Sequence, residues 1–372
     1  MTQAALDLPQ EGAPYPPSWF DRLSAWLESL PAPLWLVYLG LAVLSTAAMI
    51  LLQASQGAYS SRRIDPWHAF FVLQPVFYVA LMHYLDHAAA AALERFRPVL
   101  AGGEAEFRNA YYRLTTLPAR PVRWATLAGV LVFLVVLGPS AFQISQEPFR
   151  VEISSMALQV FGMSTSAVSR WVIFIIYLAL WGVVGVAVLH TVRQLGEIRR
   201  LYAGVAAANP FQPEPLYAFS SVTALTAVMM LLNSYGWVGV LLRVARETPG
   251  AIPLTGPISV NVFFAALSVF LFVWPLWGAH RLLDSAKKHA LGNNAGHFQA
   301  VVGRLHAAIE GGDPAGVDGW QKMLGALELE RARLDRLPTW PWRPEASRGL
   351  VAALVVPIAV WLLQFVLGKL LG

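Results

Sequence analysis

The sequence contains no cysteine, which excludes disulfide bonds, thiolate metal sites and cysteine nucleophiles. Charged residues are also scarce: Asp, Glu, Lys and Arg make up 13% of the 372 residues, against about a quarter in soluble proteins. Hydrophobic residues make up 56% of the chain. This balance predicts an integral membrane protein whose main partner is the lipid bilayer.

Patterns that carry enzyme chemistry are missing as well. We find no paired carboxylates, Ser/His/Asp set, metalloprotease HExxH pattern or phosphate-binding glycine loop, so we expect neither an enzyme nor a cofactor. The net charge of +5 does not indicate a nucleic-acid partner. The arginines fall in loops between apolar runs, where the positive-inside rule accounts for them.

Seven runs of roughly 20 mostly apolar residues are long enough to cross a hydrocarbon layer of about 30 Å. They lie near residues 33–53, 67–86, 124–143, 170–190, 217–242, 258–279 and 349–371. The runs are too long and too continuously apolar for the strands of a membrane barrel. We therefore predict an all-α fold, a polytopic bundle of seven transmembrane helices.

The distribution of Lys and Arg predicts the orientation of this bundle. With seven alternating spans, one side carries 20 of these residues and the other carries 7. Because cytoplasmic loops are enriched in Lys and Arg, we expect the N-terminus to be cytoplasmic and the C-terminus external, in a plasma or cell inner membrane. The predicted domains are a cytoplasmic tail (1–32), six spans (33–279), a cytoplasmic helical hairpin (280–346) and a seventh span (347–372).

The cytoplasmic tail contains an amphipathic helix. Its apolar residues share one helical face: Trp19, Phe20, Leu23, Trp26, Leu27 and Leu30. This pattern predicts either a helix lying in the inner membrane interface or a helix packed on the cytoplasmic loops, since both arrangements bury the same stripe.

The hairpin is the one sizeable polar region. The sixth span continues as a helix towards Gly311, and a second helix follows with apolar residues at steps of three and four. These residues predict a seam that packs on another helix and serves as an oligomer anchor: Val317, Trp320, Leu324, Leu327 and Leu334. Pro338, Pro341 and Pro344 then prevent the second helix from continuing.

The nearest approach to a metal motif is the sequence HYLDH, with His83 and His87 one helical turn apart and Asp86 beside them. Two ligand-competent histidines and one neighbour do not complete a tetrahedral shell, so the sequence predicts no metal site. His190 and His280 are interpreted as interface residues at the inner ends of their spans.

Two groups of residues are candidates for pore and ligand sites. Gln364 is the only strongly polar residue between Arg348 and Lys369, and in a symmetric oligomer one amide per subunit would form a polar ring in a hydrophobic conduit. The predicted pore-lining face contains Trp361, Gln364, Phe365 and Gly368. The predicted pocket for a small apolar ligand contains Phe71, Gln74, Phe142, Phe174, Met230, Asn233 and Tyr235. Lipid-facing or core aromatics are the alternative interpretation of the second group.

The layout resembles that of the insect odorant and gustatory receptor channels and their remote seven-transmembrane relatives. The shared features are seven spans with the N-terminus inside and the C-terminus outside, fourth and sixth helices that run into the cytoplasm, and a cytoplasmic helix before the last span. The last span also carries the final Leu-Leu-Gln-Phe that contains Gln364 and Phe365. In that family Thr-Tyr precedes five hydrophobic residues and Gln-Phe, whereas Pro357 and Ile358 stand at the first two positions here.

The resemblance implies a homotetramer, held by the hairpin helices, whose last spans surround a cation pore gated by a ligand. The alternatives are a non-conducting membrane sensor or scaffold whose hairpin recruits a partner, and a membrane transporter. The expected spans contain no Asp or Glu near the bilayer centre, which argues against ion-coupled transport.

Overall fold

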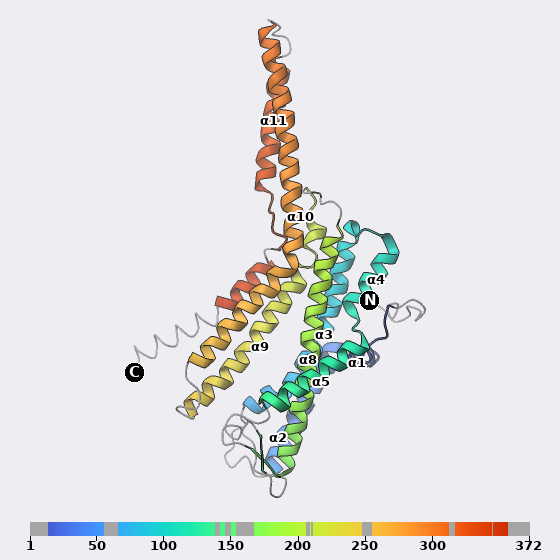
Figure 1. Cartoon of the computed structure of the whole chain (residues 1–372), viewed down its shortest axis with the longest axis vertical. Coiled ribbons are helices and arrows are strands. Elements are labelled where there is room, and N and C mark those ends of the chain that lie inside the picture. Colours follow the sequence, from blue (N-terminus) through green and yellow to red (C-terminus); the bar gives the residue numbers. More distant parts are fainter. Residues whose placement is uncertain are drawn as a thin grey trace, which may run out of the picture.

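A computed structural model of the chain describes residues 14–55, 66–137, 142–145, 150–153, 167–205, 209, 211–247, 255–311, 317–343 and 345–355. The predicted pore-lining residues Trp361, Gln364, Phe365 and Gly368 lie outside these ranges. The described part of the chain is almost entirely helical (Figure 1).

Five of the described helices are long and apolar enough to cross a membrane. They are α2 (Leu34–Ser55), α3 (Pro66–Phe96), α8 (Ala167–Ala203), α9 (Ser220–Glu247) and α10 (Thr255–Glu310). Each overlaps one of the predicted spans. The helical fold is thereby confirmed for this part of the chain, and the five helices are compatible with an integral membrane protein.

The other two predicted spans are described only in part. The third lies in α5 (Ala119–Val132) and the following π-helix η3 (Phe133–Leu137), beyond which the next residues are outside the described ranges. The seventh is helical over residues 345–355, where the described part ends. The count of seven spans therefore stays a prediction.

Shorter elements connect these helices. They are α1 (Trp19–Glu28), the 3-10 helices η2 (Arg97–Val99) and η4 (Glu214–Tyr217), α4 (Gly103–Thr115) and two short strands, β1 (Phe142–Ser145) and β2 (Arg150–Ile153). The strands pair antiparallel, with Phe142 opposite Ile153. The two strands are the only ones among the described residues, and the described part of the bundle is helical.

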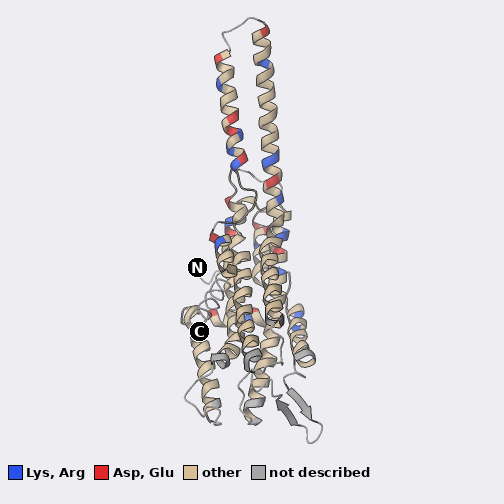
Figure 2. Cartoon of the chain, turned by 90° about the vertical axis from the view of Figure 1, so that its left-hand side faces the viewer, with Lys and Arg blue, Asp and Glu red and all other residues tan. Residues whose placement is uncertain are grey.

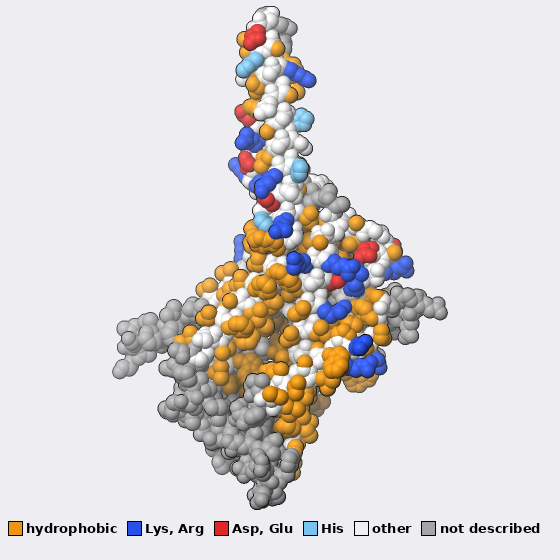
Figure 3. All heavy atoms as spheres, in the orientation of Figure 1, with side chains coloured by type: hydrophobic (Ala, Val, Ile, Leu, Met, Phe, Trp, Pro, Cys, Tyr) orange, Lys and Arg blue, Asp and Glu red, His pale blue; other side chains and the backbone are white. Residues whose placement is uncertain are grey.

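Charged and apolar side chains separate along the long axis of the molecule. Among the residues coloured in Figure 2, Lys, Arg, Asp and Glu gather on the projecting hairpin and the adjoining end of the bundle, and few lie in the coloured part of the opposite half. Large apolar side chains cover much of the bundle surface in Figure 3, and Leu44, Val262 and Phe263 are each more than half exposed. An exposed apolar band of this kind is expected of helices that face lipid.

The main core lies where α3, α8, α9 and α10 meet. Phe96, Tyr202 and Phe219 are buried there with ring centroids 5.3–6.0 Å apart, and the Tyr202 hydroxyl donates to the Leu216 carbonyl at 2.7 Å. Leu350 is buried in the same cluster. The helix at 345–355 therefore returns to the bundle after the projecting hairpin.

α5 and α8 approach each other through small residues. A Cβ atom on Gly129 would lie 2.0 Å from the Trp181 carbonyl oxygen, and one on Gly185 would lie 2.1 Å from the Ala125 carbonyl oxygen. Only glycine permits backbones to come this close, as in small-xxx-small packing of membrane helices. The pair fixes the contact between the two helices.

The second half of α10 and α11 (Val317–Arg336) form the projecting hairpin seen at the top of Figure 1, which we call the stalk. The predicted continuation of the sixth span as one helix and its end before Gly311 are confirmed. Asn294 is buried between the two helices and donates to the Leu327 carbonyl at 3.0 Å and to Glu330 at 2.9 Å. The cytoplasmic location of the stalk stays a prediction.

Aromatic stacking connects the stalk to the bundle. The Trp340 ring lies 4.0 Å from His280 and 4.6 Å from Trp342, and Trp342 stacks on Phe272 at 5.5 Å. His280 also hydrogen-bonds the Thr339 carbonyl through Nδ1 at 3.0 Å. The segment after α11 is thus held against α10 before the chain re-enters the bundle.

α1 is docked on the bundle. Ser18 and Asp21 form a capping box, and the Leu117 amide donates to the Asp21 carboxylate at 3.1 Å. Burial raises the pKa of Asp21, against the opposing effect of these hydrogen bonds. Phe20 is fully buried, whereas Trp26 is exposed. The described contacts fit the packed alternative for this amphipathic helix.

Candidate functional site

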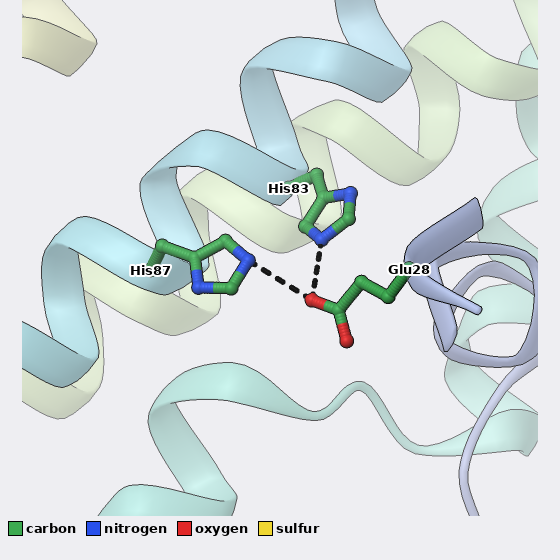
Figure 4. Close-up of side chains that lie close together, drawn as sticks. All are labelled: Glu28, His83 and His87. Atoms are coloured by element: carbon green, nitrogen blue, oxygen red, sulfur yellow. Dashed lines mark hydrogen bonds and ion pairs between the residues drawn. The ribbon is translucent and has the colours of Figure 1, made fainter. Parts of the chain in front are cut away.

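Three side chains that can bind a cation converge where the end of α1 meets the middle of α3 (Figure 4). The Glu28 carboxylate oxygen Oε1 lies 2.8 Å from His83 Nε2 and 2.9 Å from His87 Nε2. The two imidazole rings are stacked with centroids 4.9 Å apart. The three ligand atoms all lie within 4.8 Å of one another.

Helix geometry explains why both histidines reach the same carboxylate. Residues four apart on a helix lie on the same face, one turn above the other. Glu28 is the last residue of α1, and the docking of α1 on the bundle brings it to this face. The side chain of His83 is almost fully buried, whereas those of Glu28 and His87 are 31% and 57% exposed. The site is therefore closed on one side and open to solvent on the other.

A tyrosine hydroxyl holds the inner histidine. Tyr38, on α2, lies 2.8 Å from His83 Nδ1, so both ring nitrogens of His83 have partners. A hydroxyl both donates and accepts, so Tyr38 can pair with either neutral tautomer of His83. The site thus joins three helices: α1, α2 and α3.

A second carboxylate–imidazole pair joins α3 to α8. Asp86 Oδ1 is 2.8 Å from His190 Nε2 on α8, and Gln194 donates to the same oxygen at 3.2 Å. His190 and Gln194 are each 2% exposed, so this pair crosses the interior between α3 and α8. Buried charged groups are expected to be paired in this way.

The structure changes the interpretation of the histidine motif. His83 and His87 share a ligand-competent face as the sequence suggested, but Asp86 turns to His190 and the third group is Glu28. The prediction that His190 is an interface residue is wrong, because it is buried and paired. Glu28 and Tyr38 were missed because nothing in their local sequence indicates which turn of α3 they meet.

The predicted ligand-pocket residues fall into separate contacts in the described part. Gln74 donates to Asn233 at 3.0 Å, and Asn233 donates to the Tyr78 hydroxyl at 2.8 Å. Tyr235 instead donates to the Ala353 carbonyl at 2.8 Å.

The remaining members of the predicted pocket are distributed differently. Phe71 and Phe174 pack in the same apolar cluster, Met230 is half-buried, and Phe142 lies in β1. The hydrogen bonds of Gln74 and Asn233 join α3 to α9, as is expected of amides inside a membrane. A ligand pocket stays a prediction.

The predicted anchor seam packs within its own chain. Leu334 is fully buried, and Val317, Trp320, Leu324 and Leu327 are half-buried, on a helix that lies against α10. Arg304 of α10 also stands over the Trp320 ring, 5.7 Å from its centroid. The helical partner that this seam requires is therefore α10, and its role in an oligomer stays a prediction.

Comparison of the chain with protein-family models, with curated proteins and with solved structures finds no match.

Proposed function

We propose that this chain is one subunit of an oligomeric membrane ion channel, a homotetramer that conducts cations and is gated by a small apolar ligand. The observation that carries the proposal is the return of the chain to the bundle after the stalk. Leu350 is buried in the main core, and the Ala353 carbonyl accepts a hydrogen bond from Tyr235 on α9. The start of the last apolar run is thereby placed beside α9.

The returning helix has an exposed face and a face that packs on its own subunit. Val351 and Val355 are 57% and 54% exposed, so one side of the helix packs on its own subunit and the other is free to meet lipid or another subunit. Continuing the helical spacing of about 3.6 residues per turn places Gln364 on a face with Trp361, Phe365 and Gly368. Gln364 then lies on the side of Leu350 and Ala353, opposite Val355. Four copies of this face would supply a hydrophobic conduit with one polar ring.

The proposal includes the orientation of the chain in the membrane. With the N-terminus and the stalk in the cytoplasm, the charged end of the bundle in Figure 2 would face the cytoplasm, as the positive-inside rule requires. The stalk would then be the natural contact between subunits or with a cytoplasmic partner. If the chain does not conduct, the same stalk favours a membrane sensor that transmits a signal to such a partner.

The proposal is tested by measuring mass and conductance on one sample. We expect native mass determination in nanodiscs to give a tetramer and planar-bilayer recording to give discrete cation currents. Gln364→Leu should change unitary conductance or selectivity by removing the polar ring, whereas Leu362→Met, on the opposite helical face, should not. A silent monomer or dimer, or currents that Gln364→Leu leaves unchanged at equal expression, would contradict the proposal.

A further inference from the structure

The cluster of Glu28, His83 and His87 has the donor set of a metal site. Imidazole nitrogen and carboxylate oxygen together suit Zn²⁺ and neighbouring transition metals, whereas Ca²⁺ and Mg²⁺ prefer oxygen alone. Two histidines and one glutamate are also the three protein ligands of open zinc sites, in which water occupies the fourth position. We propose that these three residues bind a divalent transition-metal ion that fastens α1 to α3.

The distances allow this with small movements. In a tetrahedral site with metal–ligand bonds of about 2.0–2.1 Å, the donor atoms lie about 3.3 Å apart. Glu28 Oε1 now lies 2.8 Å and 2.9 Å from the two Nε2 atoms, so this oxygen has to move outwards by about half an ångström. All three donor atoms already lie within 4.8 Å of one another, so the two nitrogens have to close by at most about 1.5 Å. In Figure 4 both rings point towards the same carboxylate oxygen, so the nitrogens that bind the metal already converge.

A neighbouring hydroxyl provides the hydrogen-bond acceptor that the second ring nitrogen of a metal-binding histidine requires. When His83 Nε2 binds a metal, the proton sits on Nδ1, and the Tyr38 hydroxyl at 2.8 Å accepts it. The exposed side of His87 leaves an entry path and room for a water ligand.

The consequence is a metal-dependent link between the amphipathic N-terminal helix and a membrane helix. Glu28 is the last residue of α1, so a metal bound there would hold the end of the helix that the capping box at Ser18 does not. This function is separate from conduction, and its test does not depend on whether the protein forms a pore.

The test is a metal titration of the full chain, purified in detergent without a polyhistidine tag. Zn²⁺ should bind with a stoichiometry of one per chain by calorimetry, and Co²⁺ should give the visible absorption of a tetrahedral site. Outer-shell substitutions typically reduce metal affinity 10–100-fold, so Tyr38→Phe should cost about 10-fold and loss of a ligand in His87→Gln or Glu28→Gln at least about 100-fold.

The matched control is His289→Gln, because His289 is an exposed histidine on the stalk away from the cluster. This variant should keep the affinity of the unaltered chain. Hydrogen exchange of the α1 amides should slow when Zn²⁺ is added, and His87→Gln should abolish that effect. Equal Zn²⁺ affinity in His87→Gln and His289→Gln, absence of binding, or Co²⁺ spectra without tetrahedral absorption would overturn the proposal. His87 is exposed, so its substitution should leave the fold intact.

Discussion

The close approach of α5 and α8 gives a stability prediction that the structure specifies in detail. In Gly129→Ala the new methyl group would lie 2.0 Å from the Trp181 carbonyl oxygen, where ordinary contacts begin at 3.4 Å. The helices must separate locally by about 1.4 Å, the difference between those two distances. The obstruction is backbone, so no side-chain rotation relieves it, and Gly185→Ala meets the Ala125 carbonyl in the same way.

The expected cost follows from overpacking and from lost contact. Inserting one methyl group into a well-packed site costs about 1–3 kcal/mol, and separation of membrane helices also removes van der Waals contact along the interface. We expect each variant to lower the free energy of unfolding by about 3 kcal/mol. With an unfolding entropy of about 2 cal/mol/K per residue, this lowers Tm by about 4 °C.

Two other glycines of α8 supply graded controls. A Cβ on Gly182 would lie 3.2 Å from the Thr126 methyl carbon, so Gly182→Ala should cost less than the two severe variants. Gly196 has nothing within 4 Å of such an atom, and Gly196→Ala should gain up to about 1 kcal/mol because alanine favours helix. Tm is measured by tryptophan fluorescence in one detergent. A Gly129→Ala protein as stable as Gly196→Ala would refute the inferred backbone contact.

Two further predictions concern hydrogen bonds between helices. Asn233→Leu should remove the amide contacts between α9 and α3 and cost about 0.6–1.7 kcal/mol, seen as a lower Tm, whereas Leu232→Met on the exposed neighbouring position should leave Tm unchanged. Asn294→Ala should loosen the stalk and speed hydrogen exchange in α11, because the Asn294 side chain donates to the Leu327 carbonyl. The control Asn293→Ala changes an exposed, adjacent residue and should leave the exchange unchanged. Equal behaviour within either pair of variants would contradict the corresponding contact.

Hydropathy predicted the long helices well because spanning a bilayer imposes a strict length and composition. The continuation of the sixth span into the stalk was also predictable, since Gly311 and the later prolines bound the two helices. The limits of α5 and the hairpin of β1 and β2 were not predictable. α5 and the π-helix share one apolar run, whose hydropathy does not distinguish an α-helix from a π-helix, and the strands begin only where that run ends.

Only half of the candidate site was predictable from the sequence. Helical spacing places His83 and His87 on one face, but the sequence contains no information on which neighbouring helix faces them. Glu28 reaches them because Phe20 is buried against α3, α5 and α8, which fixes where the end of α1 lies. Such contacts between distant segments depend on tertiary packing, and a single sequence does not reveal them.

The distribution of specific contacts argues for where a second subunit would bind. Lipid tails are as apolar as leucine, so membrane helices are held by close packing and by hydrogen bonds rather than by the hydrophobic effect. Within the described residues, glycine packing joins α5 to α8, amides join α3 to α9, and carboxylate–imidazole pairs join α3 to α1 and α8. The start of α10 instead exposes Ile258, Val262 and Phe263 by more than 60% each. If this face and the exposed side of the helix at 345–355 meet a second subunit in the proposed tetramer, bulky polar substitutions at Val262 should reduce tetramer formation before they reduce subunit stability.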